Sequence, residues 1–321
     1  MIWVGWRQQR IETLIAAAML VLLAAVAIPT GLHMASVYTH DGLNACSGND
    51  ESSGCGFVVG SFESRFSGIN LLFSWSTLLP AVAALLLAAP FVLDLDNGTY
   101  RLFWTQSITR RRWIVTKLGL SMVALVAVAG CLIALAMWVR APLDHLDGRM
   151  SASTYDAEGI VPIADAVFVF GVAVALGAVW RRTVPALLVG FVVYVIGRAF
   201  MDSWLRQRLL TPVKKTWQMA GNGGPNLNRA LVINQFPSDS KGKQLANVVR
   251  LCGNKSSGGF LSHTQHVCVQ PQAAGVRSYM TAIYQPASRF WELQGIEFAI
   301  VAGIGTLLVL LAGFWTYRRI A

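Results

Sequence analysis

Long apolar stretches alternate with polar ones along the whole chain, and six apolar stretches are long enough to cross a lipid bilayer. A membrane-spanning helix needs about 20 mostly apolar residues, with a range of about 17–25. The pattern therefore predicts an all-α membrane protein with six transmembrane helices. The predicted spans are residues 13–33, 70–93, 115–139, 161–180, 184–200 and 295–316.

Residues 94–114 lie between the second and third predicted spans and carry more charge than a simple turn needs. Asp94 and Asp96 come first, a Gly-Thr break follows, and an amphipathic stretch ends in three consecutive arginines. Acidic residues near such a break favour a helix start, and Thr109 suits the N-cap of the third span. These residues alone leave two interpretations open: a docking element for another protein, or a basic turn at the membrane surface.

The composition supports the membrane class. Only 13% of the residues are charged, the mean hydropathy is +0.52, and soluble domains carry about 25% charged residues. The first apolar stretch is too long for a signal peptide, and no small-residue cleavage site follows it cleanly, so we expect it to be retained. Residues 1–12 mix Trp and Arg, which fits an interfacial helix or an aromatic belt before the first span.

Basic residues in the short connecting segments predict the orientation, because cytoplasmic loops are enriched in Lys and Arg. With both termini inside, the inner segments hold eleven basic residues and the outer loops 34–69 and 140–160 hold three. The inner set is Arg7, Arg10, Arg101, Arg110, Arg111, Arg112, Lys117, Arg181, Arg182, Arg318 and Arg319; the outer set is Arg65, Arg140 and Arg149. We therefore predict a multi-pass protein of the cell (plasma) membrane with cytoplasmic N- and C-termini.

Four of the five cysteines fall in predicted outer segments, where disulfides form. Cys46 and Cys55 lie in the first outer loop, Cys252 and Cys268 lie in the last, and Cys131 lies inside the third span. The local pairs Cys46–Cys55 and Cys252–Cys268 are our first choice, and two other pairings remain possible.

Residues 201–294, between spans 5 and 6, are long enough for a small domain. Gly- and Asn-rich stretches at 220–228 and 256–259 predict an irregular, mixed extracellular domain. Its eleven basic and three acidic residues give +8, most of the chain's net charge of +10. This charge either attracts an anionic substrate, lipid headgroup or wall polymer, or keeps a solvated surface soluble. No basic–aromatic repeat of the nucleic-acid-binding kind is present, so no nucleic acid is expected as a partner.

The sequence contains no phosphate-binding G-x-x-x-x-G-K-[ST] motif, no H-E-x-x-H and no G-x-S-x-G. We therefore expect no catalytic site and no cofactor bound by this chain. His263 and His266, together with Cys252 and Cys268, have the composition of a metal cluster. The disulfide interpretation fits an outer compartment better, so we expect no metal.

Four ionisable residues lie near the predicted outer ends of spans: Arg140, Asp165, Arg198 and Glu297. Charges at that depth are costly and usually pair with one another or face a water-filled cavity. Two interpretations stay open: an exit path or gate, and neutral pairs that fix the positions of the helices.

The segment 94–113 resembles the coupling segment of type-2 ABC transporter permeases, the membrane subunits of the G-subfamily-like exporter fold. The matching positions are Asp94, Asp96, Gly98, Thr99, Phe103, Thr109, Arg110 and Lys117. The stretches 98–113 and 284–297 are similar to an actinobacterial-type branch of this family. The chain departs from the family where Asp replaces Glu at both acidic positions and where Ser107 replaces a common proline.

This resemblance implies the permease subunit of an ATP-driven exporter, which moves a hydrophobic, amphipathic or lipid- or peptide-like substrate outward by alternating access. It also implies two copies of a separate ATP-binding subunit, which hold ATP and Mg, and a permease homodimer surrounded by membrane lipids. The residues expected to couple to the ATPase are Asp94, Asp96, Gly98, Thr99, Arg101, Phe103, Thr109, Arg110, Arg111 and Arg112. The alternative is a non-transporting sensor or assembly protein whose basic outer domain binds an anionic lipid or wall component.

The predicted organisation follows from these spans and the resemblance. It comprises an interfacial helix (1–12), spans 1 and 2 with a Cys-containing outer loop (13–93), a cytoplasmic coupling segment (94–114), spans 3 to 5 (115–200), a basic extracellular domain (201–294), and span 6 with a cytoplasmic tail (295–321).

Overall fold

The computed structural model divides the chain into two compact units, Met1–Leu210 with Ser288–Ala321, and Thr211–Ala287. The residues that the structure describes are 2–43, 55–68, 77–101, 109–150, 152–218, 224–225, 227, 229–244, 249–251, 267–269 and 279–319.

The first unit is helical. Its helices are α1 (Ile2–His40), α2 (Cys55–Arg65), α4 (Leu79–Asp96), α6 (Arg110–Asp147), α7 (Ala152–Tyr155), α8 (Val161–Trp180), α9 (Thr183–Phe200), the π-helix η2 (Met201–Leu205), α10 (Arg206–Leu209), the 3₁₀-helix η3 (Ala287–Arg289) and α11 (Phe290–Arg319). Six helical segments in the described chain are long and apolar enough to cross a membrane, which confirms the predicted number.

The helix boundaries have local causes. Pro80 and Pro162 lie in the first turns of α4 and α8, where the missing N–H of proline costs nothing. Gly148 ends α6 with a φ of 75°, a conformation that glycine adopts without strain. The predicted segment 1–12 and the first predicted span form one continuous helix, α1.

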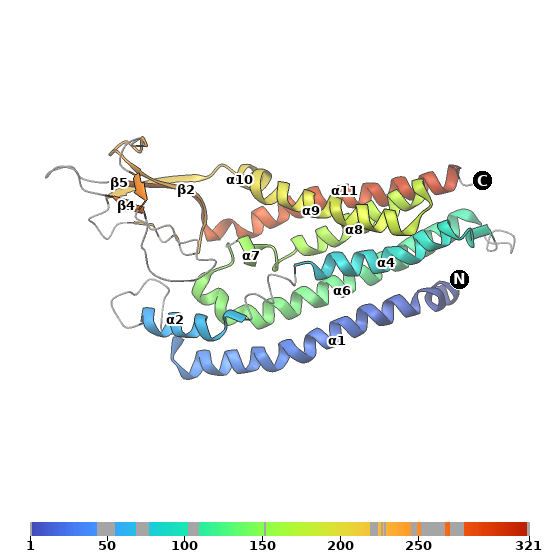
Figure 1. Ribbon diagram of the computed structural model, residues 1–321, viewed down its shortest axis with the longest axis horizontal. Coiled ribbons are helices and arrows are strands. Elements are labelled where there is room, and N and C mark those ends of the chain that lie inside the picture. The colour runs from blue at the N-terminus through green and yellow to red at the C-terminus, as the bar shows by residue number, and fades with distance from the viewer. Residues whose placement is uncertain are drawn as a thin grey trace. The chain divides into compact units, whose positions relative to one another are not determined.

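Long helices that follow one another in the chain of the first unit run in opposite directions (Figure 1). α1 begins, and α11 ends, at the same end of the bundle; we call this the termini end. The connection from α4 to α6 and the turn from α8 to α9 also lie at the termini end. The last residues of α6 and of α9 lie at the opposite end, which we call the charged end for reasons given below.

α8 is the central helix and packs against α11, α4, α9 and α6. Most of its residues are buried. It crosses α11 where Gly171 meets Gly305, since a Cβ built on Gly171 would lie 2.4 Å from the Gly305 carbonyl oxygen. A Cβ on Gly177 would lie 2.5 Å from the Val92 side chain of α4. Small residues therefore let three helix backbones approach closely, as is common in membrane bundles.

The second unit contains a three-stranded antiparallel sheet in the order β1-β5-β2, and a two-stranded ribbon of β3 and β4. The strands are β1 (Val213–Gln218), β2 (Leu231–Ser238), β3 (Val249–Leu251), β4 (Val267–Val269) and β5 (Tyr279–Gln285). The Thr281 hydroxyl in the central strand lies 2.8 Å from that of Thr216 and 2.7 Å from that of Ser238, so hydroxyl contacts link all three strands. The segment predicted to be irregular and mixed thus contains a regular sheet.

We expect Gly305→Ala to destabilise the first unit, because its Cβ would lie 2.7 Å from the backbone of Phe168. Overpacking of this kind costs about 1–3 kcal/mol. The control is Gly303→Ala on the same helix, where a Cβ meets nothing within 4 Å. Thermal unfolding in mild detergent should show a lower Tm for Gly305→Ala alone, and equal Tm values for both variants would contradict the packing.

Candidate functional site

Four arginines and six carboxylates gather at the charged end of the first unit, and we call this set the charged cluster. Its members are Arg140, Asp144, Arg149, Asp156, Glu158, Asp165, Arg198, Asp202, Arg206 and Glu297. They come from α6, the turn before α8, α8 itself, α9, η2, α10 and α11. The cluster therefore ties together most of the long helices at one end.

Two arginines organise one half of the charged cluster. Arg206 donates to both carboxylate oxygens of Glu297, at 3.0 and 3.1 Å, and lies 2.8 Å from Asp156. Arg198 donates to Asp165 at 3.0 Å and to Glu297 at 3.2 Å, and it also pairs with Asp156. Glu297 is fully buried, and the two-pronged contact with Arg206 supplies the neutralisation that a buried carboxylate requires.

The other half of the charged cluster is built on α6. Arg140 donates to Glu158 at 3.0 Å and to the Thr154 hydroxyl at 2.8 Å. Arg149 lies 3.2 Å from Asp144, a carboxylate of α6 that is also buried. Both arginines thus fasten the end of α6 to residues just before α8.

Gln294 of α11 connects the same turn to the last helix. Its side-chain oxygen accepts hydrogen bonds from the backbone N–H groups of Ile160 (3.0 Å) and Val161 (2.9 Å), and its amide nitrogen donates to the carbonyl of Tyr155 (3.1 Å). The first N–H groups of a helix have no partner within the helix, so Gln294 supplies one for α8. The fit is close, because a Cβ on Gly159, whose φ is 75°, would lie 2.7 Å from this side chain.

The charged cluster has two more carboxylates than arginines. Burial, and then the neighbouring Asp144 carboxylate, raises the pKa of Glu158 to about 8. Burial also raises the pKa of Asp156, against the opposing effect of Arg198 and Arg206. The turn before α8 can therefore hold a proton near neutral pH, which brings the cluster closer to electrical balance.

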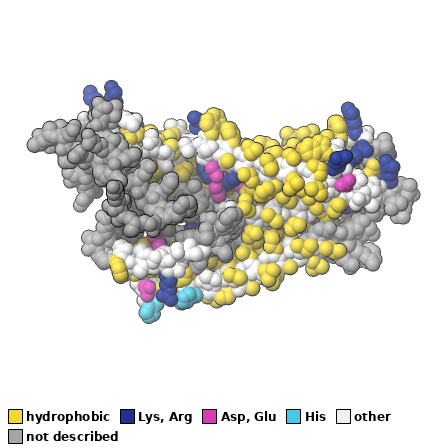
Figure 2. Space-filling model, in the orientation of Figure 1, with side chains coloured by type: hydrophobic (Ala, Val, Ile, Leu, Met, Phe, Trp, Pro, Cys, Tyr) yellow, Lys and Arg dark blue, Asp and Glu magenta, His cyan; other side chains and the backbone are white. Residues whose placement is uncertain are grey.

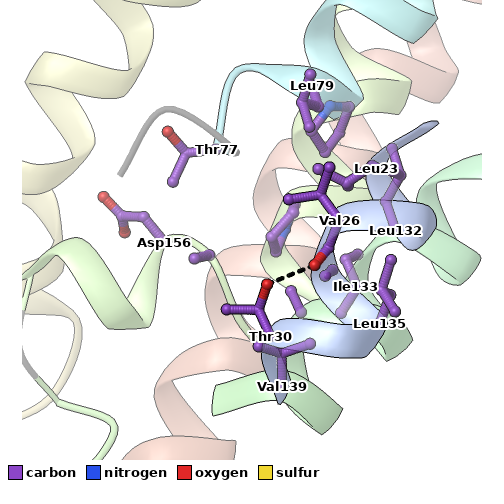
Figure 3. A pocket seen from close by; sticks show the side chains of 15 residues that line it. Leu23, Val26, Thr30, Thr77, Leu79, Leu132, Ile133, Leu135, Val139 and Asp156 are labelled. Atoms are coloured by element: carbon purple, nitrogen blue, oxygen red, sulfur yellow. Dashed lines mark hydrogen bonds between the residues drawn. The ribbon is translucent and has the colours of Figure 1, made fainter. Parts of the chain in front are cut away.

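A cavity of about 50 Å³ borders Asp156 and is otherwise lined mainly by apolar side chains of α1, α4 and α6. Figure 3 shows Thr30 and Thr77 among them; the Thr30 hydroxyl donates to the Val26 carbonyl of its own helix at 2.5 Å. Such a cavity has room for a few water molecules, whereas pockets for organic ligands measure about 300–1,000 Å³. A larger substrate would require α1 to move away from α4 and α6.

At the termini end, the acidic residues of the predicted coupling segment tie it to the bundle. Asp94 pairs with Lys117 of α6 and accepts a hydrogen bond from the Thr99 hydroxyl at 2.9 Å. Asp96 accepts hydrogen bonds from the backbone N–H (2.9 Å) and the hydroxyl (2.8 Å) of Thr183, the first residue of α9. Both aspartates belong to the last turn of α4, so the turn that ends α4 is fastened to α6 and to α9.

The rest of the predicted coupling segment is described only in part. Gly98 has a φ of 69°, residues 100–101 are helical, and Thr109 precedes α6 in an extended conformation. Phe103 lies outside the described residues. Arg101, Arg111 and Arg112 are exposed and Arg110 is half-buried. Figure 2 shows Lys and Arg side chains gathered at the termini end, beside a hydrophobic surface over the middle of the helices.

The cysteine prediction is only partly within the described chain. Cys46 and Cys252 lie outside the described residues, and the side chain of Cys268 does too. Cys55 is the first residue of α2, and the predicted pairing stays a prediction. Cys131 is a free thiol on the exposed surface of α6, inside the third span as predicted. Among the described residues, no group of three His, Cys, Asp or Glu side chains could hold a metal ion, and His263 and His266 lie outside them.

The structure brings Asp165, Arg198 and Glu297 together, and places Arg140 in the other half of the same charged cluster. Sequence reasoning missed most of their partners, namely Asp144, Arg149, Asp156, Glu158, Asp202, Arg206 and Gln294. One signal was available: the polar run Thr-Tyr-Asp-Ala-Glu at 154–158 lies directly before an apolar span.

The family model described as ABC-2 membrane transporter related matches residues 17–206, which is more than half of the chain. The matched range contains the predicted coupling segment and all four arginines of the charged cluster, while Gln294 and Glu297 lie beyond it. No curated protein and no solved structure matches the chain.

The raised pKa of Glu158 predicts a pH-dependent stability. Between 4.5, the ordinary value for Glu, and about 8, the folded protein retains a proton that the unfolded chain releases. The contribution of this group to the free energy of unfolding therefore falls as pH rises through that window. We expect the Tm in detergent to fall between about pH 5 and pH 8, and Glu158→Gln to flatten this dependence. The control is Glu292→Gln, an exposed carboxylate of α11; an identical pH profile for Glu158→Gln and wild type would contradict the prediction.

Proposed function

This chain belongs to the ABC-2 membrane transporter related family, and from that premise we propose that it is the permease subunit of an ATP-driven exporter. The family supports a multi-pass membrane component of an ABC transporter that works with an ATP-binding subunit. In this proposal two ATP-binding subunits hold ATP and Mg, two copies of this chain form the permease, and residues 94–113 receive the ATPase.

One observation carries the proposal: the segment that would receive the ATPase is fastened to the two helices that carry Arg140 and Arg198. Asp94 binds Lys117 on α6, which also carries Arg140. Asp96 binds Thr183, the first residue of α9, which also carries Arg198. Lys117 and Arg140 are 23 residues apart in α6, a separation of about 35 Å at the rise of an α-helix. Movement of the coupling segment would therefore displace α6 and α9 at the termini end. Because helices are stiff, the same movement would displace Arg140 and Arg198 at the charged end.

The charged cluster acts in this proposal as the closed gate. Its ion pairs hold the ends of α6, α8, α9 and α11 together. A cavity of about 50 Å³ lies beside Asp156, and a hollow of about 190 Å³ borders Asp165 and Arg198. When ATP closes the two ATPase subunits, α6 and α9 tilt, the arginines leave their carboxylates and the charged end opens to water. Packed interfaces of this kind tend to switch between discrete arrangements, which is what alternating access requires.

The orientation and the class of cargo follow from the distribution of charge and apolar surface. Exposed arginines surround the termini end, so this end faces the cytoplasm and the charged end faces outward. The second unit then lies outside the cell. The cavity near the gate has apolar walls with a few polar atoms, which suits a hydrophobic, amphipathic or lipid- or peptide-like substrate that enters as α1 moves.

We expect the double charge reversal Arg101→Glu with Arg112→Glu to weaken binding of the ATP-binding subunit about tenfold or more, because both side chains are exposed within the docking segment. The matched control is Arg318→Glu with Arg319→Glu, which changes the net charge equally at the same end but outside residues 94–113. Affinity between the purified subunits is the measurement. Equal affinity in both double variants would contradict the assignment of the docking segment.

Asp96→Ala tests whether binding of the ATP-binding subunit and the transmission of its movement to the bundle depend on different contacts. The variant removes both hydrogen bonds to Thr183 while the exposed arginines stay in place, so the ATP-binding subunit should still bind. We expect the stimulation of ATP hydrolysis by the permease to fall several-fold, because movement of the ATPase is no longer transmitted to α9 through these two hydrogen bonds.

Asp41→Ala is the control, because it removes an exposed carboxylate from the chain segment after α1. Wild-type stimulation in Asp96→Ala would contradict the proposed connection to α9. Loss of ATPase binding would instead assign Asp96 to the contact itself.

A further inference from the structure

A second, larger hollow lies between α6 and α11, away from the charged cluster. This groove has a volume of about 580 Å³ and almost entirely apolar walls. It runs from Arg111 and Tyr317 near the termini end to Met122 and Thr306 deeper in the bundle. Twelve residues of each helix span it, and eleven steps at 1.5 Å per residue give about 17 Å. That length is close to half of the roughly 30 Å hydrocarbon core of a bilayer, the depth of one leaflet.

Glycines shape the groove. Gly313 of α11 allows close contact, since a Cβ there would lie 3.4 Å from the Ile114 side chain of α6. Gly119 of α6 leaves the space open, since a Cβ there would meet nothing within 4 Å. The two helices thus touch at one point and leave a slot beside it with the length of an acyl chain.

The mouth of the groove is positively charged, whereas its deeper walls are apolar. Arg111 and Arg112 are exposed, and Arg111 lines the mouth together with Tyr317. The carboxylates of α6 and α11 are Asp144, Asp147, Glu292 and Glu297, and all of them lie toward the charged end of their helices. A second copy that packed with these helices side by side in the same direction would therefore bring no negative charge to Arg111. The negatively charged headgroup of a membrane lipid at the mouth of the groove can supply the complementary charge.

We propose that the groove between α6 and α11 binds one anionic phospholipid, with an acyl chain along Gly119 and the phosphate at Arg111. The Tyr317 ring lies at the level of the headgroup, where aromatic residues are common in membrane proteins. An apolar chain gains no hydrophobic energy by leaving the bilayer for the groove, so close packing holds the chain and Arg111 selects the headgroup. A single basic residue near an anionic surface corresponds to about fivefold in affinity. Arg111 also lies within residues 94–113, which the proposed function assigns to the ATPase contact, whereas the rest of the lining lies outside that segment. The lipid titration uses this chain without an ATP-binding subunit, so failure of the lipid site and failure of the proposed function are distinguishable.

Native mass spectrometry of the full chain in mild detergent tests this site directly. The protein is titrated with phosphatidylglycerol and, separately, with phosphatidylcholine of the same acyl chains. We expect one phosphatidylglycerol to bind about fivefold more tightly than phosphatidylcholine. Arg111→Gln should remove this preference, and Arg112→Gln, one residue along but outside the lining of the groove, should keep it.

A second experiment fills the groove with a larger side chain. Gly119→Leu should abolish the retained lipid of either kind, because a Cβ at this position meets nothing within 4 Å and the added side chain would occupy the slot. Gly303→Leu, at an open position of α11 outside the groove, is the control. Equal affinity for both lipids in the wild type would overturn the proposal. So would unchanged lipid retention in Gly119→Leu, or a change in the monomer–dimer ratio in place of lipid loss, which would assign the groove to a second copy.

Discussion

Buried charges in a membrane protein must meet opposite charges, and the ion pairs of the charged cluster satisfy this constraint for the whole first unit. Arg206 and Arg198 neutralise Glu297 from two sides, and Arg140 meets Glu158 across the end of α6. Removing one partner from such a set leaves an uncompensated charge, which costs about 3–5 kcal/mol. The arrangement is therefore stable when all members are paired, or when the whole end opens to water. A partly separated cluster, in which a buried charge has lost its partner, is unfavourable.

Two long helices, α6 and α9, connect the termini end of the first unit to its charged end. Asp94 and Asp96 are only two residues apart, yet they bind the beginnings of two different helices, α6 and α9. Each of these helices carries an arginine of the charged cluster in its second half. Members of this family normally work with an ATP-binding subunit, and in the proposed function the two aspartates transmit its movement to α6 and α9. The close contact between Gly171 and Gly305 holds α8 and α11 against each other at their crossing.

The sequence predicted the number of spans because long apolar stretches have few other uses. Charge and resemblance also led to the prediction of a coupling segment at residues 94–113. It also identified four charged residues at span ends, since a charge in an apolar stretch is visible without a structure. It could not identify their partners. Asp156 and Glu158 lie in a short turn that looks like a solvated loop, and Gln294 is one of several glutamines with no distinguishing pattern. Their importance arises from tertiary contacts between different elements, and the hydrogen bond of Gln294 to Ile160 joins residues that are 134 positions apart. The strands of the second unit were missed because Gly- and Asn-rich connections dominate its sequence.

The most direct test of the central claim is site-specific photo-crosslinking in the protein's own host. A photoreactive amino acid replaces Arg112 at the termini end in one strain and Ser203, an exposed residue at the charged end, in another. Irradiation, purification in mild detergent and mass spectrometry then identify what is attached. The account predicts an ATP-binding subunit crosslinked at position 112 and none at position 203. An ATP-binding subunit captured at position 203, or a stable partner of another kind captured at position 112, would contradict it.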